Sequence, residues 1–380
     1  MNRQPVDVLV VGAGPAGLAA AMYCASHGLT TRLIARAPRA QRVASALQSL
    51  HPRAETLLYQ LGATAALHSA TALRFDGIWT AAVQHPFSPF AGVQLYGFHV
   101  DRFRFDSLLL QHALAMGVRM DGYETVAGLI EEEGRVAGVR TRRGACWRAR
   151  WCIDASGYAR ALASRLDVVD RACSPPLLVA SGVIADANAE REATRFEARP
   201  DGWSWFTPSL QGRHTWTGLQ QRGEQRSPEL RQLIGRSVTG SVQLADASWR
   251  LTRPLARTGV LVVGDAAGRL DPAAGIGVVN ALESGIMAAR ALVDGRAEPA
   301  LAAVFQAQYD SWFVERFDEN ARQLKDFYLA HNIAVLDELS AATWPGTHRR
   351  RRNSHGATGM ASIHSPRWAD LADFSTAGKD

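Results

Sequence analysis

The chain opens with VLVVGAGPAGLAAAMYCASHG, which runs from Val8 to Gly28. The first four residues form a short apolar run of the kind found in buried parallel strands. Glycines follow in the order G-x-G-x-x-G, and an alanine-rich helix is expected over Pro15 to Ser26. The first glycine allows a tight turn, the second lets the backbone approach a pyrophosphate, and the third lets helix and strand pack closely. The pattern predicts a dinucleotide at the helix N-terminus, held by Gly12, Gly14, Pro15, Ala16 and Gly17.

The next predicted strand, Thr31 to Ala35, departs from this pattern. A dinucleotide-binding unit normally ends this strand on an acid that accepts a hydrogen bond from a ribose hydroxyl. Here the strand ends on Ala35 and Arg36, and no Asp or Glu lies between Asp7 and Glu55. Either backbone groups hold the ribose, or Arg36 stacks on the adenine or contacts a phosphate.

A second glycine-rich segment follows another short apolar run, Val260 to Val263. It reads GDAAG from Gly264 and DPAAGIG from Asp271, and a helix is expected over Val278 to Leu292. The segment resembles the second FAD motif of the flavoprotein hydroxylase and halogenase superfamily. The resemblance implies that the Asp of GD bonds a ribityl hydroxyl. It also implies that the glycine turn faces the flavin, where a helix dipole stabilises negative charge on the reduced ring. The cofactor contacts that it implies are Gly264, Asp265, Pro272, Gly275, Ile276 and Gly277.

Two stretches between these motifs carry further resemblances. GFHVDRFRFDSLLLQHALAMG, from Gly97, reads as a strand end followed by a helix. It resembles the family segment in which an Arg reaches the FAD pyrophosphate; Arg102 takes that place, and Arg42 is a second candidate. The turn from Asp154 to Gly157 reads D-x-S-G, as in halogenases and reductases, rather than the D-G of hydroxylases that bind NADPH. The electron source is therefore expected to be NAD(P)H or a separate flavin reductase.

The expected fold class is α/β (α+β overall). It comprises a Rossmann-like FAD-binding domain of the aromatic-hydroxylase type, an inserted mixed β-sheet substrate domain, and C-terminal helices. The FAD-binding domain is expected to be discontinuous, because two interruptions separate its segments. The expected boundaries are residues 1–62, 97–173 and 254–298 for the FAD-binding domain, 63–96 and 174–253 for the substrate domain, 299–346 for the helices, and 347–380 for a flexible tail.

The substrate domain is rich in aromatic residues, which suits either a pocket for a flat substrate or a sheet core. GWSWFTP, from Gly202, resembles the W-x-W-x-I-P signature of flavin-dependent halogenases, and its Trp203 and Trp205 are candidate catalytic-site residues. Halogenases also need a lysine in the N-terminal part of the chain to handle hypohalous acid. Lysine occurs here only at Lys325 and Lys379, and arginine does not replace its chemistry. This absence argues against halogenation.

SALQSLHPRAETLLYQLG, Ser45 to Gly62, reads as a loop running into a helix. It resembles the E-S-L-x-P loop that lies beside the isoalloxazine in related flavoproteins, with Gln48 in place of the acid. His51 is therefore a candidate catalytic residue that donates or accepts a proton near the flavin or attaches it covalently. A purely structural histidine is the alternative.

Together these segments most resemble a subgroup of halogenase-like flavoproteins that includes the maturases of tryptophylquinone-dependent oxidases and amine dehydrogenases. That resemblance implies a monooxygenase in which a C4a-hydroperoxyflavin, formed from molecular oxygen, hydroxylates an electron-rich ring. An indole or tryptophan is the expected ring, in a small molecule or in a partner protein. The alternatives are an isoprenoid-type FAD reductase, a non-catalytic flavoprotein that assists maturation, and a halogenase-like enzyme without its lysine.

Composition sets further limits on the 380-residue chain. An apolar content of 47% supplies a substantial core,. No apolar run is long enough for a membrane span, and no signal peptide is apparent, so a cytoplasmic protein is expected. The net charge of +6 comes without a nucleic-acid-binding motif,. The four cysteines show no metal-ligand spacing, so no metal site is expected.

Overall fold

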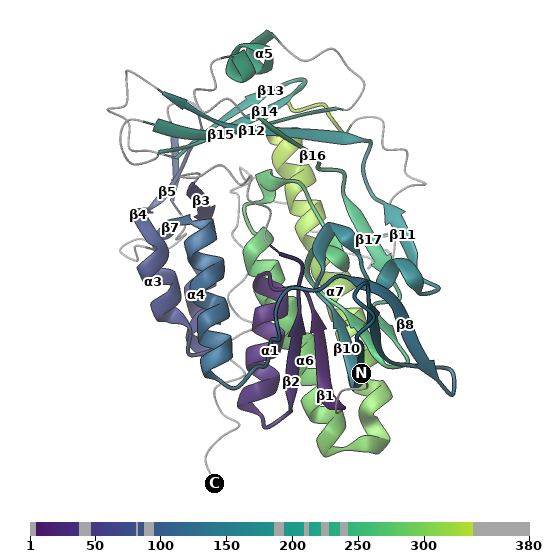
Figure 1. Ribbon diagram of the computed structural model, residues 1–380. Coiled ribbons are helices and arrows are strands. Elements are labelled where there is room, and N and C mark those ends of the chain that lie inside the picture. Colours follow the sequence, from purple (N-terminus) through teal and green to yellow (C-terminus); the bar gives the residue numbers. More distant parts are fainter. Residues whose placement is uncertain are drawn as a thin grey trace, which may run out of the picture.

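The computed structural model describes residues 5–37, 47–80, 83–86, 95–185, 194–208, 213–221, 228–235 and 242–336. Two β-sheet layers and a set of long helices make up this part of the chain (Figure 1). The larger helices lie beside the first sheet, and the second sheet forms a layer across one end of it.

The first sheet is built on β1, whose apolar residues are buried between helices and a β-hairpin. β1 pairs in parallel with a strand on each side, with Val8 opposite Thr31 and Val11 opposite Asp154. The parallel order continues to β19, and β18, β8 and β9 add antiparallel pairs at the margins. The strands are β1 (Val6–Val11), β2 (Thr31–Ile34), β10 (Cys146–Asp154), β19 (Val260–Val262), β18 (Ala256–Arg257), β8 (Val126–Glu132) and β9 (Arg135–Thr141).

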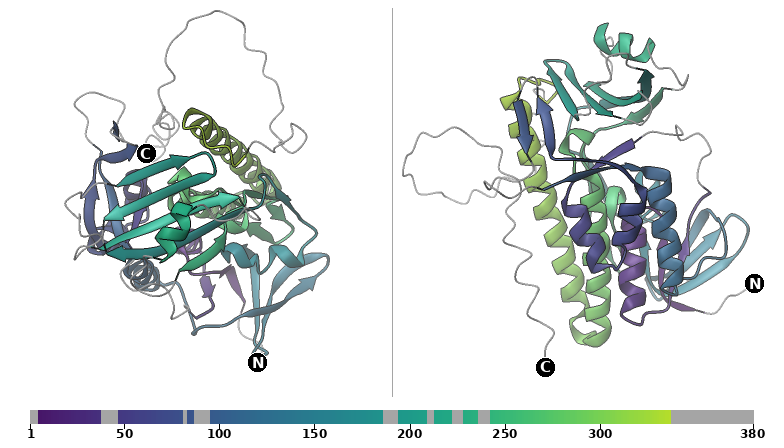
Figure 2. Two further views of the ribbon diagram at one scale, coloured as in Figure 1. Left: turned by 90° about the horizontal axis from the view of Figure 1, so that it is seen from above. Right: turned by 90° about the vertical axis from the view of Figure 1, so that its left-hand side faces the viewer.

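Helices cover this sheet at close range because small residues line their contacts. A Cβ added to Gly285 would lie 2.2 Å from the carbonyl oxygen of Ala16, so only glycine fits where two of these helices cross. Figure 2 shows the two longest helices running side by side toward the second sheet. The helices are α1 (Pro15–Ser26), α2 (Arg53–Gln60), α3 (Thr64–Ala70), α4 (Arg102–Ala115), α6 (Gly277–Ala297) and α7 (Ala302–Ala330).

The second sheet is mixed, since β13 and β5 pair in parallel while the other neighbours are antiparallel. Trp203 and Trp205 share one face of β14, because side chains alternate along a strand. Phe206 packs on the opposite face with Trp216 and with Leu230 of the outer helix α5 (Pro228–Gly235). In spatial order the strands are β16 (Gln243–Asp246), β12 (Leu177–Ala185), β15 (Arg213–Gln221), β14 (Gly202–Pro208), β13 (Arg195–Arg199), β5 (Gly77–Thr80) and β6 (Val83–Pro86).

Two small sheets and several single turns of 3-10 helix connect the layers. One small sheet contains β3 (Leu47–Leu50), β7 (Gly97–Asp101) and β4 (Thr71–Phe75), and the other contains β11 (Val169–Ala172), β17 (Arg250–Arg253) and β20 (Gly268–Arg269). The turns are η1 (Gly157–Ala159), η2 (Ala163–Arg165), η3 (Gly264–Ala266), η4 (Pro272–Ala274) and η5 (Pro299–Leu301).

The predicted fold class is confirmed, and the helix expected over Pro15 to Ser26 has those limits. One local expectation was wrong: the segment before His51 contains β3 rather than only a loop, because it pairs with β7. The domain boundaries stay predictions, and the predicted tail lies outside the described residues. No helix among the described residues combines the length and apolar character that crossing a bilayer requires.

Candidate active site

The N-terminus of α1 leaves room for an anion. Gly14 begins the helix in an extended conformation, no described side chain caps it, and its first turn carries no acid. A Cβ added to Gly14 would have no atom within 4 Å, whereas one added to Gly12 or Gly17 would lie about 2 Å from a backbone oxygen. Gly12 and Gly17 therefore serve the packing, and Gly14 faces open space next to unpaired helix N–H groups.

The two glycine-rich segments meet at this end of α1. A Cβ added to Gly264 would lie 2.8 Å from the Cβ of Ala16. The Gly264 N–H donates to Ser284 Oγ on α6 at 2.9 Å, which fixes η3 between the two helices. The fold thus brings two motifs that lie far apart in the sequence into direct contact.

Asp265 and Arg102 lie near each other beside this junction. Burial raises the pKa of the Asp265 carboxyl, while the charges of Arg102 and Arg269 lower it. The Arg102 guanidinium donates to Asp106 Oδ1 and to Gln48 Oε1, each at 2.7 Å. These bonds hold a cation that is about a quarter exposed and acts on Asp265, and such a cation suits a pyrophosphate.

The buried carboxylate of Asp271 fixes the turn that precedes α6. Asp271 is 1% exposed, and its oxygens accept hydrogen bonds from Trp249 Nε1 at 2.7 Å, Tyr328 Oη at 2.8 Å and the Ala273 N–H at 2.9 Å. Burial raises its pKa to about 6, and these bonds act in the opposite direction. The anchored turn ends at Gly275 in the left-handed conformation, with φ of +66°.

Tyr328 extends this network to the second sheet. Its hydroxyl accepts a hydrogen bond of 2.7 Å from Trp203 Nε1 while it donates to Asp271. Trp203 has no exposed surface, so it packs in the core and does not present its ring to a substrate. The pairing of Asp271 with Tyr328 leaves no local signal in the sequence, since the two positions lie far apart in the chain.

Trp205 has a different position, although it lies only two residues along the same strand. It is partly exposed, and its Cη2 is 3.9 Å from where a Gly275 Cβ would be. Phe196 packs edge-on against the Trp205 ring with 5.9 Å between centroids. Trp205 therefore forms an aromatic wall over the glycine turn, and the Trp203–Tyr328–Asp271 hydrogen bonds connect the strand to that turn.

His51 lies between β3 and α2 and is largely buried. Its Nδ1 accepts a hydrogen bond of 3.2 Å from the Arg53 N–H, which assigns the neutral tautomer with the proton on Nε2,. Burial, with a smaller contribution from the Arg53 charge, lowers its pKa to about 4. At neutral pH this imidazole is uncharged and carries its proton on Nε2.

The remaining predicted cofactor residues are distributed around the same loops. Pro272, Gly275 and Gly277 are exposed, Ile276 is half-buried, and a Cβ on Gly277 would have no atom within 4 Å. Arg36 is exposed at the end of β2. Arg42 lies outside the described residues. The D-x-S-G turn at Asp154 has a structural role, because this buried carboxylate accepts hydrogen bonds from Ser156, Leu162 and Ala163.

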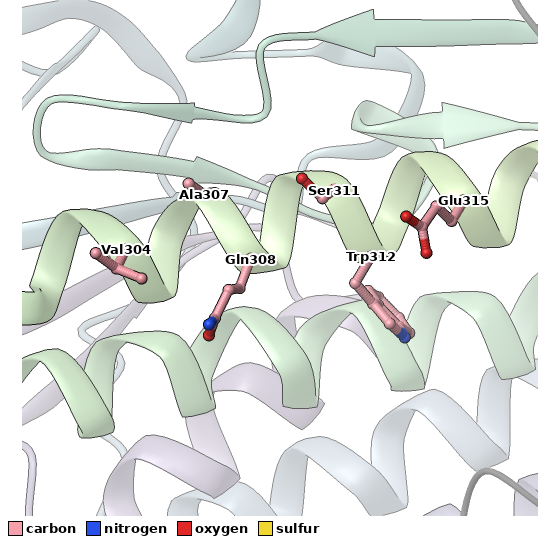
Figure 3. Close-up of a pocket in the computed structure, with 6 residues that line it drawn as sticks. All are labelled: Val304, Ala307, Gln308, Ser311, Trp312 and Glu315. Carbon is pink, nitrogen blue, oxygen red and sulfur yellow. The ribbon is translucent and has the colours of Figure 1, made fainter. Parts of the chain in front are cut away.

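A surface depression elsewhere on the molecule does not belong to this arrangement. Figure 3 shows its lining side chains projecting from one helix, α7, and none comes from the glycine-rich loops. Its lining residues are Val304, Ala307, Gln308, Ser311, Trp312 and Glu315.

Comparison with known proteins identifies the family of this chain. Residues 64–331 match the family model of tryptophan halogenase, and residues 7–49 match that of an FAD-binding domain. The chain belongs to the tryptophan halogenase family. The suspected superfamily is thereby confirmed, and the protein is an FAD-dependent oxidoreductase.

Members and neighbours of the tryptophan halogenase family catalyse different reactions. The digeranylgeranylglycerophospholipid reductase of Thermoplasma acidophilum is 25% identical over 360 residues, which covers 87% of this chain and 88% of the relative. The tryptophan 2-halogenase of Chondromyces crocatus is 27% identical over 379 residues, covering 86% and 70%. The solved structure of the peptidyl tryptophan dihydroxylase QhpG, essential for tryptophylquinone cofactor biogenesis, shares the fold with a TM-score of 0.67 and 22% identity, covering 87% and 77%.

The residues of this family member fit FAD. The open space at Gly14, the uncapped helix N-terminus and the nearby Arg102 suit a pyrophosphate, and Asp265 supplies an acceptor for sugar hydroxyls,. At the other end of the arrangement, the aromatic ring of Trp205 packs on the Gly275 turn.

Proposed function

We propose that the protein is a flavin-dependent monooxygenase that hydroxylates an electron-rich aromatic ring, an indole or tryptophan side chain. The observation that carries this proposal is the partly exposed Trp205 wall facing the Gly275 turn. A flat ring stacks on the exposed part of the Trp205 face beside this turn. The bound FAD supplies oxygen activation, and NAD(P)H or a flavin reductase supplies the electrons.

The side chains around this wall have separate tasks in the proposal. Trp205 and Phe196 exclude water and orient the ring. Arg102 neutralises the cofactor phosphates. His51 donates a hydrogen bond from Nε2, because its Nδ1 already accepts one from Arg53. With a pKa of about 4 it is a weak base at neutral pH, which favours the donor role over the acceptor role.

Lysine placement argues for hydroxylation over halogenation within the family. Lys325, which is exposed on α7, is the only lysine in the part of the chain that the structure describes. Halogenation needs a lysine that reaches the ring from the N-terminal part of the chain, and the sequence has none there. The substrate is either a free indole or a tryptophan in a partner protein.

The test is to supply reduced FAD, oxygen and bromide together with indole or a tryptophan-containing peptide, and to identify the product by mass spectrometry. A hydroxylated ring supports the proposal. A brominated ring, or an unchanged substrate across a panel of indoles and phenols, contradicts it.

A second candidate function is reduction of isoprenoid double bonds. It is favoured by the 25% identity to an archaeal digeranylgeranylglycerophospholipid reductase that covers most of both chains. The same assay with a geranylgeranyl lipid and no oxygen separates the two. Uptake of hydrogen by the lipid supports the reductase and contradicts the hydroxylase.

A further inference from the structure

The end of β2 lacks the acid that normally holds the adenosine ribose. Ala35 and Arg36 stand there, and the nearest acids along the chain are Asp7 and Glu55. In doubly wound sheets the dinucleotide lies outside the carboxyl ends of the parallel strands. The ribose of a bound FAD therefore needs an acceptor from another segment.

The structure brings such a segment to this edge. The chain from Arg119 to Glu124 runs parallel to β2, with bridges between Arg32 and Arg119 and between Ala35 and Tyr123. The Glu124 N–H donates to the Ala35 carbonyl at 2.7 Å. Glu124 is thus fixed at the carboxyl end of β2, next to the position of the missing acid.

One carboxylate oxygen of Glu124 has no assigned partner. Its Oε2 is shielded from solvent and accepts no hydrogen bond from any residue in the described part of the chain. A buried acceptor without a donor is costly, and native structures usually satisfy such groups. A ligand that brings hydroxyl donors would remove this cost.

We propose that the Glu124 carboxylate accepts hydrogen bonds from the ribose hydroxyls of the adenosine half of FAD. It would replace the acid missing from β2. The inference rests on FAD binding by this chain and not on hydroxylation, so a failure to hydroxylate leaves it standing.

The test compares FAD with FMN, which lacks the adenosine. Dissociation constants of both flavins are measured by fluorescence titration of the apoprotein for the wild type, Glu124→Gln and the control Glu131→Gln, whose side chain is exposed on β8. We expect Glu124→Gln to bind FAD at least about tenfold more weakly, as loss of a charge-assisted hydrogen bond predicts. FMN binding and the control stay at wild-type values.

A compensating substitution makes the test more specific. Adding Ala35→Glu to Glu124→Gln places an acid back at the end of β2, and we expect it to restore FAD affinity without changing FMN affinity. Equal FAD binding by the wild type and Glu124→Gln would overturn the inference, as would an equal weakening of FAD and FMN. A wild-type protein that binds neither flavin would overturn the cofactor assignment itself, and with it the proposed function.

Discussion

At the scale of single residues, side chains that look equivalent in the sequence differ in burial and in contacts. Trp203 and Trp205 belong to the same motif, but the first is fully buried with its N–H bonded to Tyr328, and the second reaches the Gly275 turn. Burial likewise lowers the pKa of His51 to about 4 and that of His99 to about 3. His99 is fully buried between Ser49 and Thr194, whereas His51 is partly exposed and lies just before α2.

His51→Ala should lower the rate of hydroxylation about a hundredfold or more, the range typical of the loss of one positioned hydrogen-bond donor. The pKa of about 4 means that His51 stays neutral above pH 5, so the wild-type rate should show no inflection from this group between pH 5 and 8. Steady-state rates across this pH range check both points. A His51→Ala protein that binds FAD and hydroxylates normally would exclude the role.

Asp271 should make the free energy of unfolding depend on pH. The direction should be opposite to that caused by a carboxylate in an ion pair. Its folded pKa is raised to about 6, whereas an unfolded Asp titrates near 4,. Between these values the folded state binds the extra proton, so the free energy of unfolding falls as pH rises from about 4 to about 6.

Denaturant titrations of the wild type and Asp271→Asn measure this effect. The stability of the wild type relative to the variant should fall by up to about 3 kcal/mol across that interval and stay level above it. His51 and His99 titrate in both proteins, so their contributions cancel. A difference that does not change with pH would show that Asp271 keeps an ordinary pKa.

At the scale of elements, short segments from distant parts of the chain define the site together. The N-terminus of α1, η3 and α6 meet around Ala16, Gly264 and Gly285. α7 is joined to this group through Tyr328, which contacts both β14 and the turn before α6.

Gly14→Ala and Gly17→Ala should have separate effects. A Cβ at Gly17 would overlap the Gly12 carbonyl, so the apoprotein should be destabilised by several kcal/mol or fail to fold,. A Cβ at Gly14 meets no protein atom and the backbone conformation accepts alanine, so unfolding should be unchanged while FAD binding weakens. Thermal unfolding and FAD titration check the pair. Equal loss of stability in both variants would contradict an open phosphate position at Gly14.

Tyr328→Phe should loosen the connection between α7, β14 and the Asp271 turn. The change leaves the Trp203 N–H without its acceptor and removes one donor to Asp271, both in the core. The expected loss is about 1–3 kcal/mol in the free energy of unfolding. Tyr59→Phe is the matched control, since Tyr59 is 77% exposed on α2. Equal stability of the two variants would exclude a structural role for the hydroxyl.

Local pattern predicted the elements that carry the glycine motifs. The strand, turn and helix at Gly12–Gly17 follow from β-branched residues, glycine spacing and a proline at the first helical position,. The role of Trp203 and the network at Asp271 were not predictable, because they depend on hydrogen bonds between residues far apart in the chain. The strand at Leu47–Leu50 was missed because its pairing with β7, not its own sequence, makes it a strand,.

At the scale of the whole molecule, the second sheet lies across one end of the parallel sheet, and α6 and α7 run toward the second sheet (Figures 1 and 2). The family combines this architecture with several reactions, so the fold alone does not select one. In the proposed function the selection comes from an aromatic wall at Trp205 and a neutral histidine at position 51, together with a sequence that has no lysine before Lys325.

The most direct measurement of the proposed activity is the fate of heavy oxygen gas. The protein is loaded with FAD, supplied with NAD(P)H and a flavin reductase, and incubated with an indole under isotopically labelled oxygen. The account predicts a hydroxylated ring that carries one labelled oxygen atom, as detected by mass spectrometry. A hydroxyl group whose oxygen comes from water, or a product that has gained a halogen or only hydrogen, would contradict it.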